Sequence, residues 1–595
     1  MFKIHKKMNK QIKYVMLFAT AVLIMSCNDE FLERYPLTEI SDGSYWNSAN
    51  DLKIYINTFY NNDKLLPHYQ DYSMGNYGID AMNGSDTYVY VDYNTRMNGE
   101  GTVPTSGGGW EVDDWKTLRS LNYFMANYHK ATDAWEICKP YVGEALFFRT
   151  LFYFNKLRDF GDIPYTSTVL NNDSKMLFES RMRRNQVVDS LMHDMDRAVE
   201  YLPARTSTWT GRLNKETAML LQARIALYEG TWEKYHALKS TPFKVEGSDG
   251  SKFIQKAAQV SGALMTLAES NGMTALSTDV SGHALGAYNH LFIQKDYSSN
   301  KEVLFWRKYE VGVVYNRIVG ALSNGGGSGL TKSMVDSYLC IDGKPILESN
   351  QYKGDNTLKD VVANRDPRLS QTINVDDGKH VAWTQSNSFF EYPRFEGESA
   401  TAKSITGYQL YKGFDGDQAS NSQISTQSSP SCGLIYFRYA EALLIYAEAQ
   451  AELGVITQAD IDKTINALRA RAGKLATMEL DMGLLDMNAI TTDPNWLHPD
   501  LSPLLNEIRR ERTVELVCEG FRVDDIFRWA AADELLRGYI PQGAVWEQWR
   551  NYPGAIPAFV AAWTILPVDA DGCIAPYLNL TGMRDRKSTR LNSSH

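Results

Sequence analysis

Cysteine is scarce in this chain of 595 residues, and the spacing of its six cysteines excludes two kinds of structure. No two of them form a CxxC motif or a spacing typical of zinc ligands, and an odd number remains once Cys27 is set aside. We therefore expect neither a zinc site nor a disulfide framework. The other five are predicted to be small buried apolar residues: Cys138, Cys340, Cys432, Cys518 and Cys573.

Long basic runs and common catalytic motifs are also missing. The formal net charge is −10, which argues against nucleic acid as a partner. The ten histidines show no HExxH spacing, and no GxSxG motif occurs. The glycine-rich segment 325–333 lacks the contiguous Gly-Lys-Ser/Thr of a phosphate-binding loop, because Leu330 and Thr331 separate Lys332 from the glycines. We interpret it as a flexible loop and predict neither a metal nor a cofactor.

One group of carboxylates invites a catalytic interpretation. Paired carboxylates can act as acid and base, but Glu515 and Glu519 are four residues apart, a spacing that suits salt bridges on and between helices. The charged residues that follow are three apart and suit the same role. We therefore predict that the whole group is structural and that the protein is not an enzyme: Glu511, Glu515, Glu519, Arg522, Asp525 and Arg528.

Long apolar runs are absent except near the N-terminus. Residues 10–26 begin with Lys10 and Lys13 and continue through a short apolar run, which is typical of a secretory signal. The run ends in Ile24-Met25-Ser26-Cys27, which resembles a bacterial lipobox and implies cleavage before Cys27 and its acylation. Several acyl chains would anchor the protein stably to a membrane. The alternative is a plain secretory signal with an incidental cysteine.

Helical patterns fill two stretches of the chain. Residues 115–160 carry apolar side chains on more than one face, which predicts a buried helix that ends at Gly161. Residues 185–236 predict two more helices, the second closed by Gly230. Residues 436–472 predict a helical pair rich in small residues, which resembles a tetratricopeptide unit.

The segment between these stretches has a different composition. Residues 241–430 are rich in Gly, Ser, Asn and Asp, with a strand-like run at Glu302–Trp306. We predict a mostly α fold in which a scaffold of tetratricopeptide-like helical pairs, over about 30–240 and 431–530, holds a loop-rich and partly β insert. Residues 27–584 are expected to form one domain behind the signal peptide 1–26.

Several segments in order resemble the SusD/RagB family of outer-membrane nutrient-binding lipoproteins of the Bacteroidetes. Each segment alone is weak, but together they span most of the chain. They are Cys27 with Phe31–Pro36, Gly143–Arg149, Phe160–Pro164, Asp342–Pro345, Arg365–Leu369, Arg438–Glu441, Tyr446–Ala449, Asn466–Gly473, and the charged group from Glu511 to Trp529. The acidic Asn28-Asp29-Glu30 after Cys27 also resembles the signal for display on the outside of such cells.

The resemblance implies a fold, a partner and a function. It implies four tetratricopeptide-like helical pairs and a variable, loop-rich ligand surface. The partner would be a SusC-like, TonB-dependent barrel in the outer membrane, which this protein closes as a lid. The expected function is that of a cell-surface lipoprotein that binds an oligosaccharide and delivers it to the barrel. The sequence leaves open whether the ligand is a glycan or a peptide.

Aromatic side chains in the loop-rich segments are the candidate ligand contacts. The chain has 34 Tyr and 13 Trp, and such rings offer flat faces to sugar C–H groups while polar side chains bond the hydroxyls. For any single ring, core packing is the alternative. The first set is Tyr77, Tyr88, Tyr90, Tyr93 and Trp110, among Asn83, Asp86, Asp92, Asn94 and Arg96; the second is Trp306, Tyr309, Tyr315 and Asn316.

Two other functions are the alternatives to glycan binding. A surface glycosidase would show two close carboxyl groups in a deep cleft. A tetratricopeptide adaptor would bind a peptide or protein in a groove of the helical pairs themselves.

Residues 585–595 share no pattern with the preceding chain and match the translation of a common sequencing adapter, so we expect them to be foreign and the natural C-terminus to be lost.

Overall fold

The structure is a computed structural model, and the residues that it describes lie between Tyr45 and Leu578. The predicted signal, Cys27 and the tail 585–595 lie outside these residues. Within them, no helix combines the length and apolarity needed to cross a bilayer. Further stretches outside the described residues are 68–83, 92–93, 99–101, 103–104, 209, 311–312, 315–321, 323–324, 382–388, 392, 394–402, 416–431, 494–500 and 547–566.

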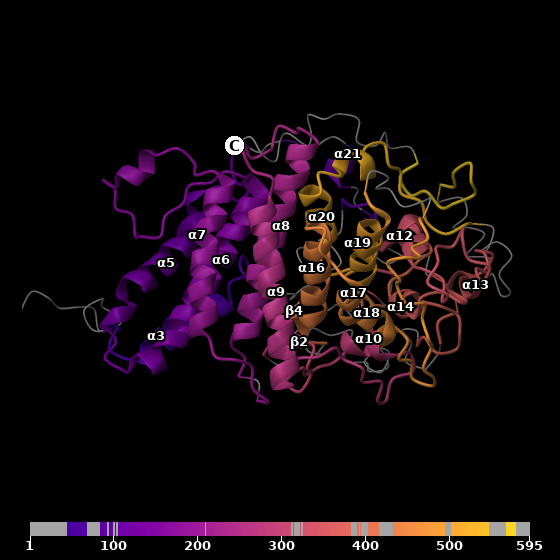
Figure 1. Cartoon of the computed structure of the whole chain (residues 1–595), viewed down its shortest axis with the longest axis horizontal. Helices are drawn as coiled ribbons and strands as arrows, with labels where there is room; N and C mark the ends of the chain where they lie inside the picture. The colour runs from indigo at the N-terminus through magenta and orange to yellow at the C-terminus, as the bar shows by residue number, and fades with distance from the viewer. Residues whose placement is uncertain are drawn as a thin grey trace, which may run out of the picture.

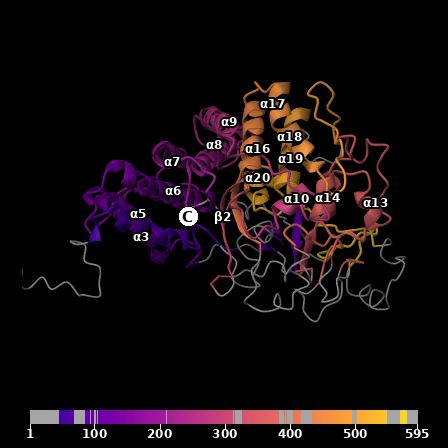
Figure 2. The same cartoon turned by 90° about the horizontal axis from the view of Figure 1, so that it is seen from below.

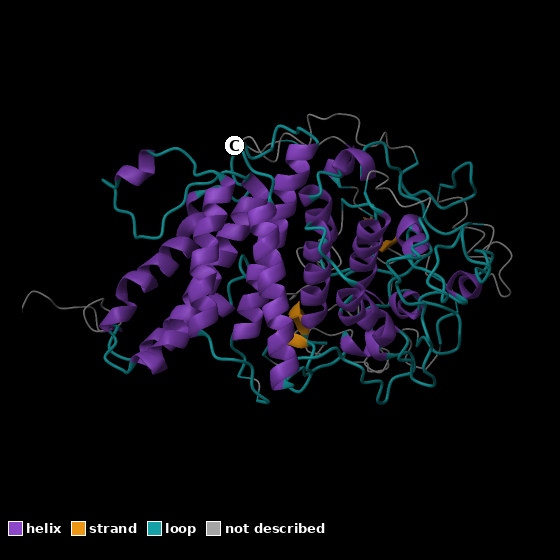
Figure 3. Ribbon diagram, viewed as in Figure 1, coloured by secondary structure: helices purple, strands orange, loops and turns teal. Residues whose placement is uncertain are grey.

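Long helices packed side by side form the main body (Figures 1 and 3). Neighbours in the row are in contact from α5 through α6, α7, α8, α9 and α16 to α19, and α3 packs on α6. The predicted mostly α fold is confirmed. The helices are α3 (Ala49–Tyr60), α5 (Val112–Asn127), α6 (Trp135–Phe160), α7 (Arg184–Tyr201), α8 (Lys215–Leu238), α9 (Ser251–Asn271), α16 (Tyr439–Glu452) and α19 (Pro503–Glu515).

Several local expectations agree with these helices. Helix α6 is buried on more than one face and ends at Gly161, whose φ of 71° is a conformation that glycine adopts at no steric cost. The short helices α17 (Gln458–Lys463) and α18 (Ile465–Ala472) follow α16. Thr457 and Asp460 form the predicted capping box at the start of α17. The five cysteines after Cys27 are buried, as predicted.

Two expectations about the α8–α9 region are wrong. Gly230 does not close a helix but lies inside α8, and α9 occupies part of the segment that we expected to be loop-rich. The glycine is needed for close packing, because a Cβ at Gly230 would lie 2.6 Å from the Ile254 backbone nitrogen. The helical scaffold therefore extends to Asn271, and α8 and α9 form one of its hairpins.

The remaining elements are short and lie mostly after α9. Figure 2 shows α3 to α7 on one side of α8 and α9, and the later helices α10, α13 and α14 on the other. The helices are α4 (Thr95–Asn98), η3 (Tyr128–Lys130), η4 (Lys175–Phe178), α10 (Ala287–Leu291), α12 (Lys332–Ser337), α13 (Leu358–Val362), α14 (Pro367–Thr372), α20 (Arg522–Arg528) and α21 (Ala532–Leu535).

Two small antiparallel sheets connect distant parts of the chain. Strand β1 (Tyr88–Tyr90) pairs with β3 (Ser328–Leu330), so that Tyr88 lies opposite Leu330. Strand β2 (Val303–Arg307), which was predicted from the sequence, pairs with β4 (Leu434–Arg438) immediately before α16. The pairing joins the later segment directly to the helical scaffold.

A buried ionic cluster makes a second connection between these parts. Its acids come from α19, from the residue before α14 and from the segments before β2 and after α19, and its bases come from α14, α18, β4, α19 and the turn that holds Lys412. We call it the Glu515 cluster; its acids are Glu302, Asp366, Glu507, Glu511, Glu515 and Glu519, and its bases are Arg368, Lys412, Arg438, Arg469, Arg471 and Arg510.

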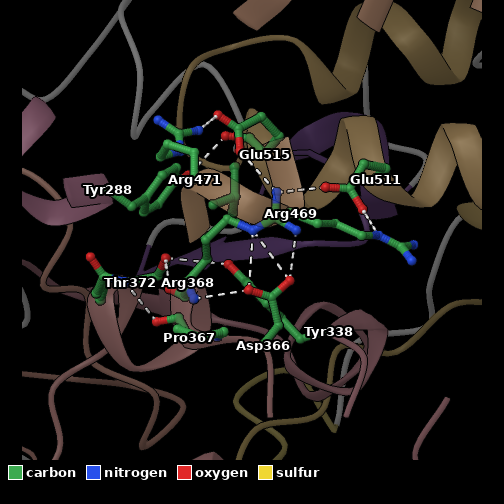
Figure 4. Close-up of polar contacts among 12 residues, drawn as sticks. Tyr288, Tyr338, Asp366, Pro367, Arg368, Thr372, Arg469, Arg471, Glu511 and Glu515 are labelled. Atoms are coloured by element: carbon green, nitrogen blue, oxygen red, sulfur yellow. Dashed lines mark hydrogen bonds and ion pairs between the residues drawn. The ribbon is translucent and has the colours of Figure 1, made fainter. Parts of the chain in front are cut away.

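Glu515 lies at the centre of this cluster. It accepts from Arg438 at 2.7 Å and from Arg368 at 2.9 Å, and it also pairs with Arg471. Figure 4 shows the guanidinium groups of Arg368 and Arg471 beside carboxylates, among them those of Asp366 and Glu515. Burial raises the pKa of Glu515, but the guanidinium groups outweigh this effect and hold the pKa well below its ordinary value. The structural interpretation of these carboxylates is confirmed for Glu511, Glu515 and Glu519.

Candidate functional site

A cavity of about 1650 Å³ lies where α6 ends, α7 begins and the last turns of α8 meet α20 and α21. It lies near α21 at the top of Figure 1. We call it the α6–α8 cavity. Six aromatic side chains line it: Trp110, Phe160, Tyr228, Trp232, Phe243 and Phe527.

Trp110 reaches the cavity from the loop that precedes α5. Its ring packs edge-to-face against Phe160, with 4.6 Å between centroids, and against Trp115 at 5.4 Å. The guanidinium of Arg181 lies 4.7 Å from the ring centroid. Trp110 is half-buried, so part of the side chain is available to a ligand.

A buried lysine holds this loop against α6. The ammonium of Lys156 donates to the carbonyl oxygen of Gly109, next to Trp110. It lies 5.5–5.7 Å from the ring centroids of Trp115, Phe152 and Phe160, where the negative ring faces stabilise the charge. The contact fixes Trp110 in place before any ligand arrives.

The α8 wall is a stack of side chains held by hydrogen bonds. The Arg184 guanidinium lies 3.8 Å from the Trp232 ring centroid and forms a two-pronged ion pair with the buried Glu229. Trp232 in turn stacks on His236 with 4.1 Å between centroids. The stack is rigid because each member is held by its neighbours.

His236 is neutral in this stack. Burial lowers the pKa of His236 to about 3. Its Nε2–H donates to the carbonyl of Phe527 at 3.0 Å, which leaves Nδ1 to accept from the hydroxyl of Thr241 at 2.6 Å. Both ring nitrogens are used, so the imidazole supports the wall and has no proton to exchange with a ligand.

The opposite wall supplies charged groups. Arg158 and Asp524 form an ion pair between α6 and α20. The Arg96 guanidinium lies 5.2 Å from the Phe527 ring centroid. Burial lowers the pKa of Arg96, while the nearby Asp524 and Asp159 oppose this effect. Rings and polar groups of both signs therefore share one cavity, an arrangement that suits a polar ligand with apolar faces.

Among the described residues, neither a metal site nor the carboxylates that the sequence singled out lie at this cavity. No three or more side chains of His, Cys, Asp and Glu gather there in an arrangement that could hold a metal ion. Glu511 and Glu515 are fully buried in the Glu515 cluster and do not line the cavity.

Comparison with known sequences places the chain in a family. Residues 290–555 match the SusD family, and residues 115–227 match a family described as starch-binding and associating with the outer membrane. The chain belongs to the SusD/RagB family. The resemblance read from the sequence motifs is confirmed.

Two curated relatives of this SusD/RagB protein come from Formosa agariphila. SusD-like protein P38 is 22% identical over 557 residues, which cover 91% of this chain and 96% of the relative. SusD-like protein P2 is 24% identical over 440 residues, which cover 71% of this chain and 72% of the relative. The similarity extends over both the helical scaffold and the later segments.

Solved structures show the same fold. A SusD-like carbohydrate binding protein from Bacteroides fragilis superposes with a TM-score of 0.66 at 20% identity, over 92% of this chain and 97% of that one. Surface glycan-binding protein A from Bacteroides fluxus superposes with a TM-score of 0.52 at 18% identity, over 83% of this chain and 91% of that one. At these identities the likeness concerns the fold alone.

The structure divides the ligand-contact residues predicted for this SusD/RagB protein into four groups. Trp110 and Arg96 line the α6–α8 cavity. Tyr88, Trp306 and Tyr309 are only 1–2% exposed and belong to the core, so the prediction that they form an exposed platform is wrong. Tyr90 is half-buried against the core around Tyr88. Tyr77, Asn83, Asp92, Tyr93, Tyr315 and Asn316 lie outside the described residues.

Strand pairing explains why the rings that were wrongly predicted to be exposed are buried. Tyr88 lies in β1 and Trp306 in β2, and both strands find partners far away in the sequence. Trp306 packs edge-to-face with Tyr297 at 5.3 Å and against Gly433, where an added Cβ would lie 2.7 Å from its ring. Asp86 has a structural role as well, because it forms a buried ion pair with Arg522 at 2.6 Å.

Most of the residues that line the cavity were not predicted from the sequence. Phe160, Trp232 and His236 lie on predicted helices, where aromatic residues are expected to be core. The available signal was their position in the last turns of α6 and α8. In a row of antiparallel helices every second helix runs parallel, so the last turns of α6 and α8 lie at the same edge of the bundle, on either side of the start of α7, where rings can reach solvent.

Proposed function

We propose that this protein binds an oligosaccharide in the α6–α8 cavity at the cell surface and hands it to a TonB-dependent outer-membrane barrel of the SusC kind. The observation that carries the proposal is the cavity itself, in which Trp110 and five other rings lie among fixed charged groups. Two proteins of the same fold are described as carbohydrate-binding and as surface glycan-binding, which supports a sugar ligand.

The physical chemistry of sugars fits this lining. A sugar hydroxyl is well hydrated, so each hydrogen bond to protein adds only about 0.5–1.5 kcal/mol net. Buried apolar area adds about 25 cal/mol per Å², and the C–H faces of a pyranose supply such area to an aromatic ring. Arg184 and Lys156 already fix the rings by ion pairs and cation–π contacts, so little ordering is required on binding.

Membrane attachment is proposed to come from the N-terminal cysteine. No helix among the described residues could serve as the anchor. The lipobox-like end of the signal makes Cys27 the residue to be acylated. One family that matches the chain is described as associating with the outer membrane, which supports this location.

Binding assays with matched variants test the proposal. The purified protein is run in native gels that contain amylopectin, xylan, pectin or carrageenan, and the polysaccharide that retards it is then used in titration calorimetry as a purified oligosaccharide. Trp110→Ala should weaken binding by about ten- to 100-fold, or 1.4–2.8 kcal/mol. Phe178→Ala is the control, because that ring is 84% exposed on η4 and does not line the cavity.

The outcomes separate binding from other functions. Equal loss in both variants, or no loss in a folded Trp110→Ala protein, would remove the cavity from the proposal. Release of reducing ends from the bound glycan would instead identify a glycosidase. Purification of the anchored protein from native membranes tests the partner, since a TonB-dependent barrel should copurify and be identified by mass spectrometry.

A further inference from the structure

An aromatic row lies at the other end of α6 from the cavity. Trp135 is the first residue of α6, and its ring packs edge-to-face against Tyr201 at 5.2 Å between centroids. Tyr128 of η3 lies 6.2 Å from Trp135 on the other side. The row therefore gathers three rings from the end of α7, the start of α6 and the turn after α5.

Trp135 is unusual because its surface is open to solvent. It is 43% exposed, whereas Trp46, Trp232, Trp306, Trp529 and Trp546 are buried. Tyr128 and Tyr201 pack against the main core with part of each ring, and Trp135 extends the row outward. An exposed tryptophan needs a reason that core packing does not supply, because large rings are favoured inside.

Polar groups surround the row. The exposed His129 lies 6.1 Å from the Tyr128 ring. The Arg197 guanidinium lies 5.7 Å from the Tyr201 ring centroid. The first turn of α6 carries the ion pair between the exposed Glu136 and the partly exposed Lys139. Rings flanked by donors and acceptors match the C–H faces and hydroxyls of a sugar.

The size of the row favours a sugar over a protein. A specific protein interface buries about 800 Å² per partner and has an apolar centre. Here the first turn of α6 exposes Trp135 and Ile137, which is 56% exposed, and the charged Glu136 and Lys139 lie on the same turn. A few sugar rings would cover such a patch completely.

The row and the cavity share one rigid support. Trp135 is the first residue of α6 and Phe160, which lines the cavity, is the last. At about 1.5 Å rise per residue, they are about 38 Å apart along the helix. A long glycan could touch both sites, while a short oligosaccharide could occupy only one.

We propose that Tyr128, Trp135 and Tyr201 form a second glycan-binding site, which captures polysaccharide chains whose other segment occupies the α6–α8 cavity. The inference rests on the proposed function of that cavity and adds the substrate class, a polymer and not a free short oligosaccharide. Two linked contacts raise the apparent affinity because the second contact forms within an already bound complex.

Long and short forms of one glycan distinguish the two sites. The polysaccharide that retards the wild-type protein in native gels is compared with its own tetrasaccharide. Trp135→Ala should weaken polysaccharide binding at least about tenfold and leave tetrasaccharide binding unchanged. Trp110→Ala should weaken both. Ile137→Ala is the matched control on the same turn and should change neither.

Each outcome decides a different point. If the wild-type protein binds no glycan, the proposed function fails and the second site fails with it. If Trp110→Ala weakens binding but Trp135→Ala does not, only the second site is overturned. If Ile137→Ala weakens polysaccharide binding as much as Trp135→Ala, the patch is a general apolar contact and the second site is again overturned.

A measurement on the wild-type protein tests the second site even if the Trp135→Ala variant fails to fold. N-bromosuccinimide oxidises exposed tryptophans, and peptide mass analysis locates the product. Polysaccharide should protect Trp135, whereas the tetrasaccharide should protect Trp110 and leave Trp135 reactive. Equal oxidation of Trp135 with and without polysaccharide would overturn the second site. If the Trp135→Ala protein still binds polysaccharide but the barrel no longer copurifies with it from membranes, the row is a contact with a protein instead.

Discussion

Replacing Glu515 by Gln should destabilise the protein strongly, because it leaves a positive charge buried. The Glu515 cluster contains six acids and six bases, and nearly all of their side chains are buried. Glu515→Gln removes one negative charge without changing the shape of the side chain. The new amide group also faces guanidinium donors from Arg368, Arg438 and Arg471, to which its own N–H groups cannot bond.

The expected loss is about 3–5 kcal/mol, which is typical for removal of one partner of a buried ion pair. Glu534→Gln is the matched control. Glu534 pairs with Lys239 at 2.6 Å, but both side chains are about one-third exposed. Such a pair adds about 0–1 kcal/mol to the free energy of unfolding, so the urea midpoint of the control should be close to that of wild type.

Urea denaturation followed by circular dichroism measures both variants. The midpoint of Glu515→Gln should fall well below those of wild type and Glu534→Gln, and the free energies are compared only if the transitions have equal slopes. Arg471→Gln in the Glu515→Gln background leaves five acids and five bases. The double variant should therefore lose less than the sum of the single losses. A Glu515→Gln midpoint equal to that of the control would refute the charge-balance reasoning.

Four further predictions follow from packing, charge and the N-terminal motif. Gly230→Ala should cost about 1–3 kcal/mol, measured by urea unfolding, because its Cβ would meet the α9 backbone. Trp306→Ala should cost about 3–5 kcal/mol in the same assay, because the ring is buried. Burial raises the pKa of Glu448, but Arg528 outweighs it and the pKa falls to about 2. A carboxyl group with a lowered pKa stabilises the fold above its ordinary pKa of 4.5, so the free energy of unfolding should fall as the pH drops from 4.5 to about 2. The fall should be less steep in Glu448→Gln, and urea midpoints measured across this pH range compare the two proteins. Cys27→Ala should release the protein from membranes and abolish its labelling by fatty acid, as measured by fractionation.

Each of these expectations has a contrary result. Gly262→Ala inside α9 controls for a glycine change within a helix, because its Cβ would meet only the Tyr446 side chain and no backbone atom; equal losses would show that helix contact at Gly230 is unimportant. A fully stable Trp306→Ala would return that ring to the list of ligand contacts. Identical pH profiles would remove Glu448 as a source of acid sensitivity. A membrane-bound Cys27→Ala protein would indicate another anchor.

The sequence alone determined the family and most of the scaffold. Helical periodicity, the stop residue Gly161 and the capping residue Thr457 act locally, so they are readable without tertiary information. The spacing of Glu515 and Glu519 likewise predicted a structural role, because carboxylates four residues apart suit salt bridges. Glu515 is the last residue of α19 and Glu519 lies just beyond the helix, and both pair with Arg438.

Tertiary structure alone decided which rings are buried in the core and which line the α6–α8 cavity. Nothing local to Trp306 shows that β4, over one hundred residues later, covers it, and nothing local to Trp232 shows that the ends of α6 and α20 leave a cavity beside it. Gly230 was misjudged for the same reason, since a helix interior and a helix end look alike until the position of α9 is known. Burial depends on contacts between distant segments, and a single sequence records the residues but not these contacts.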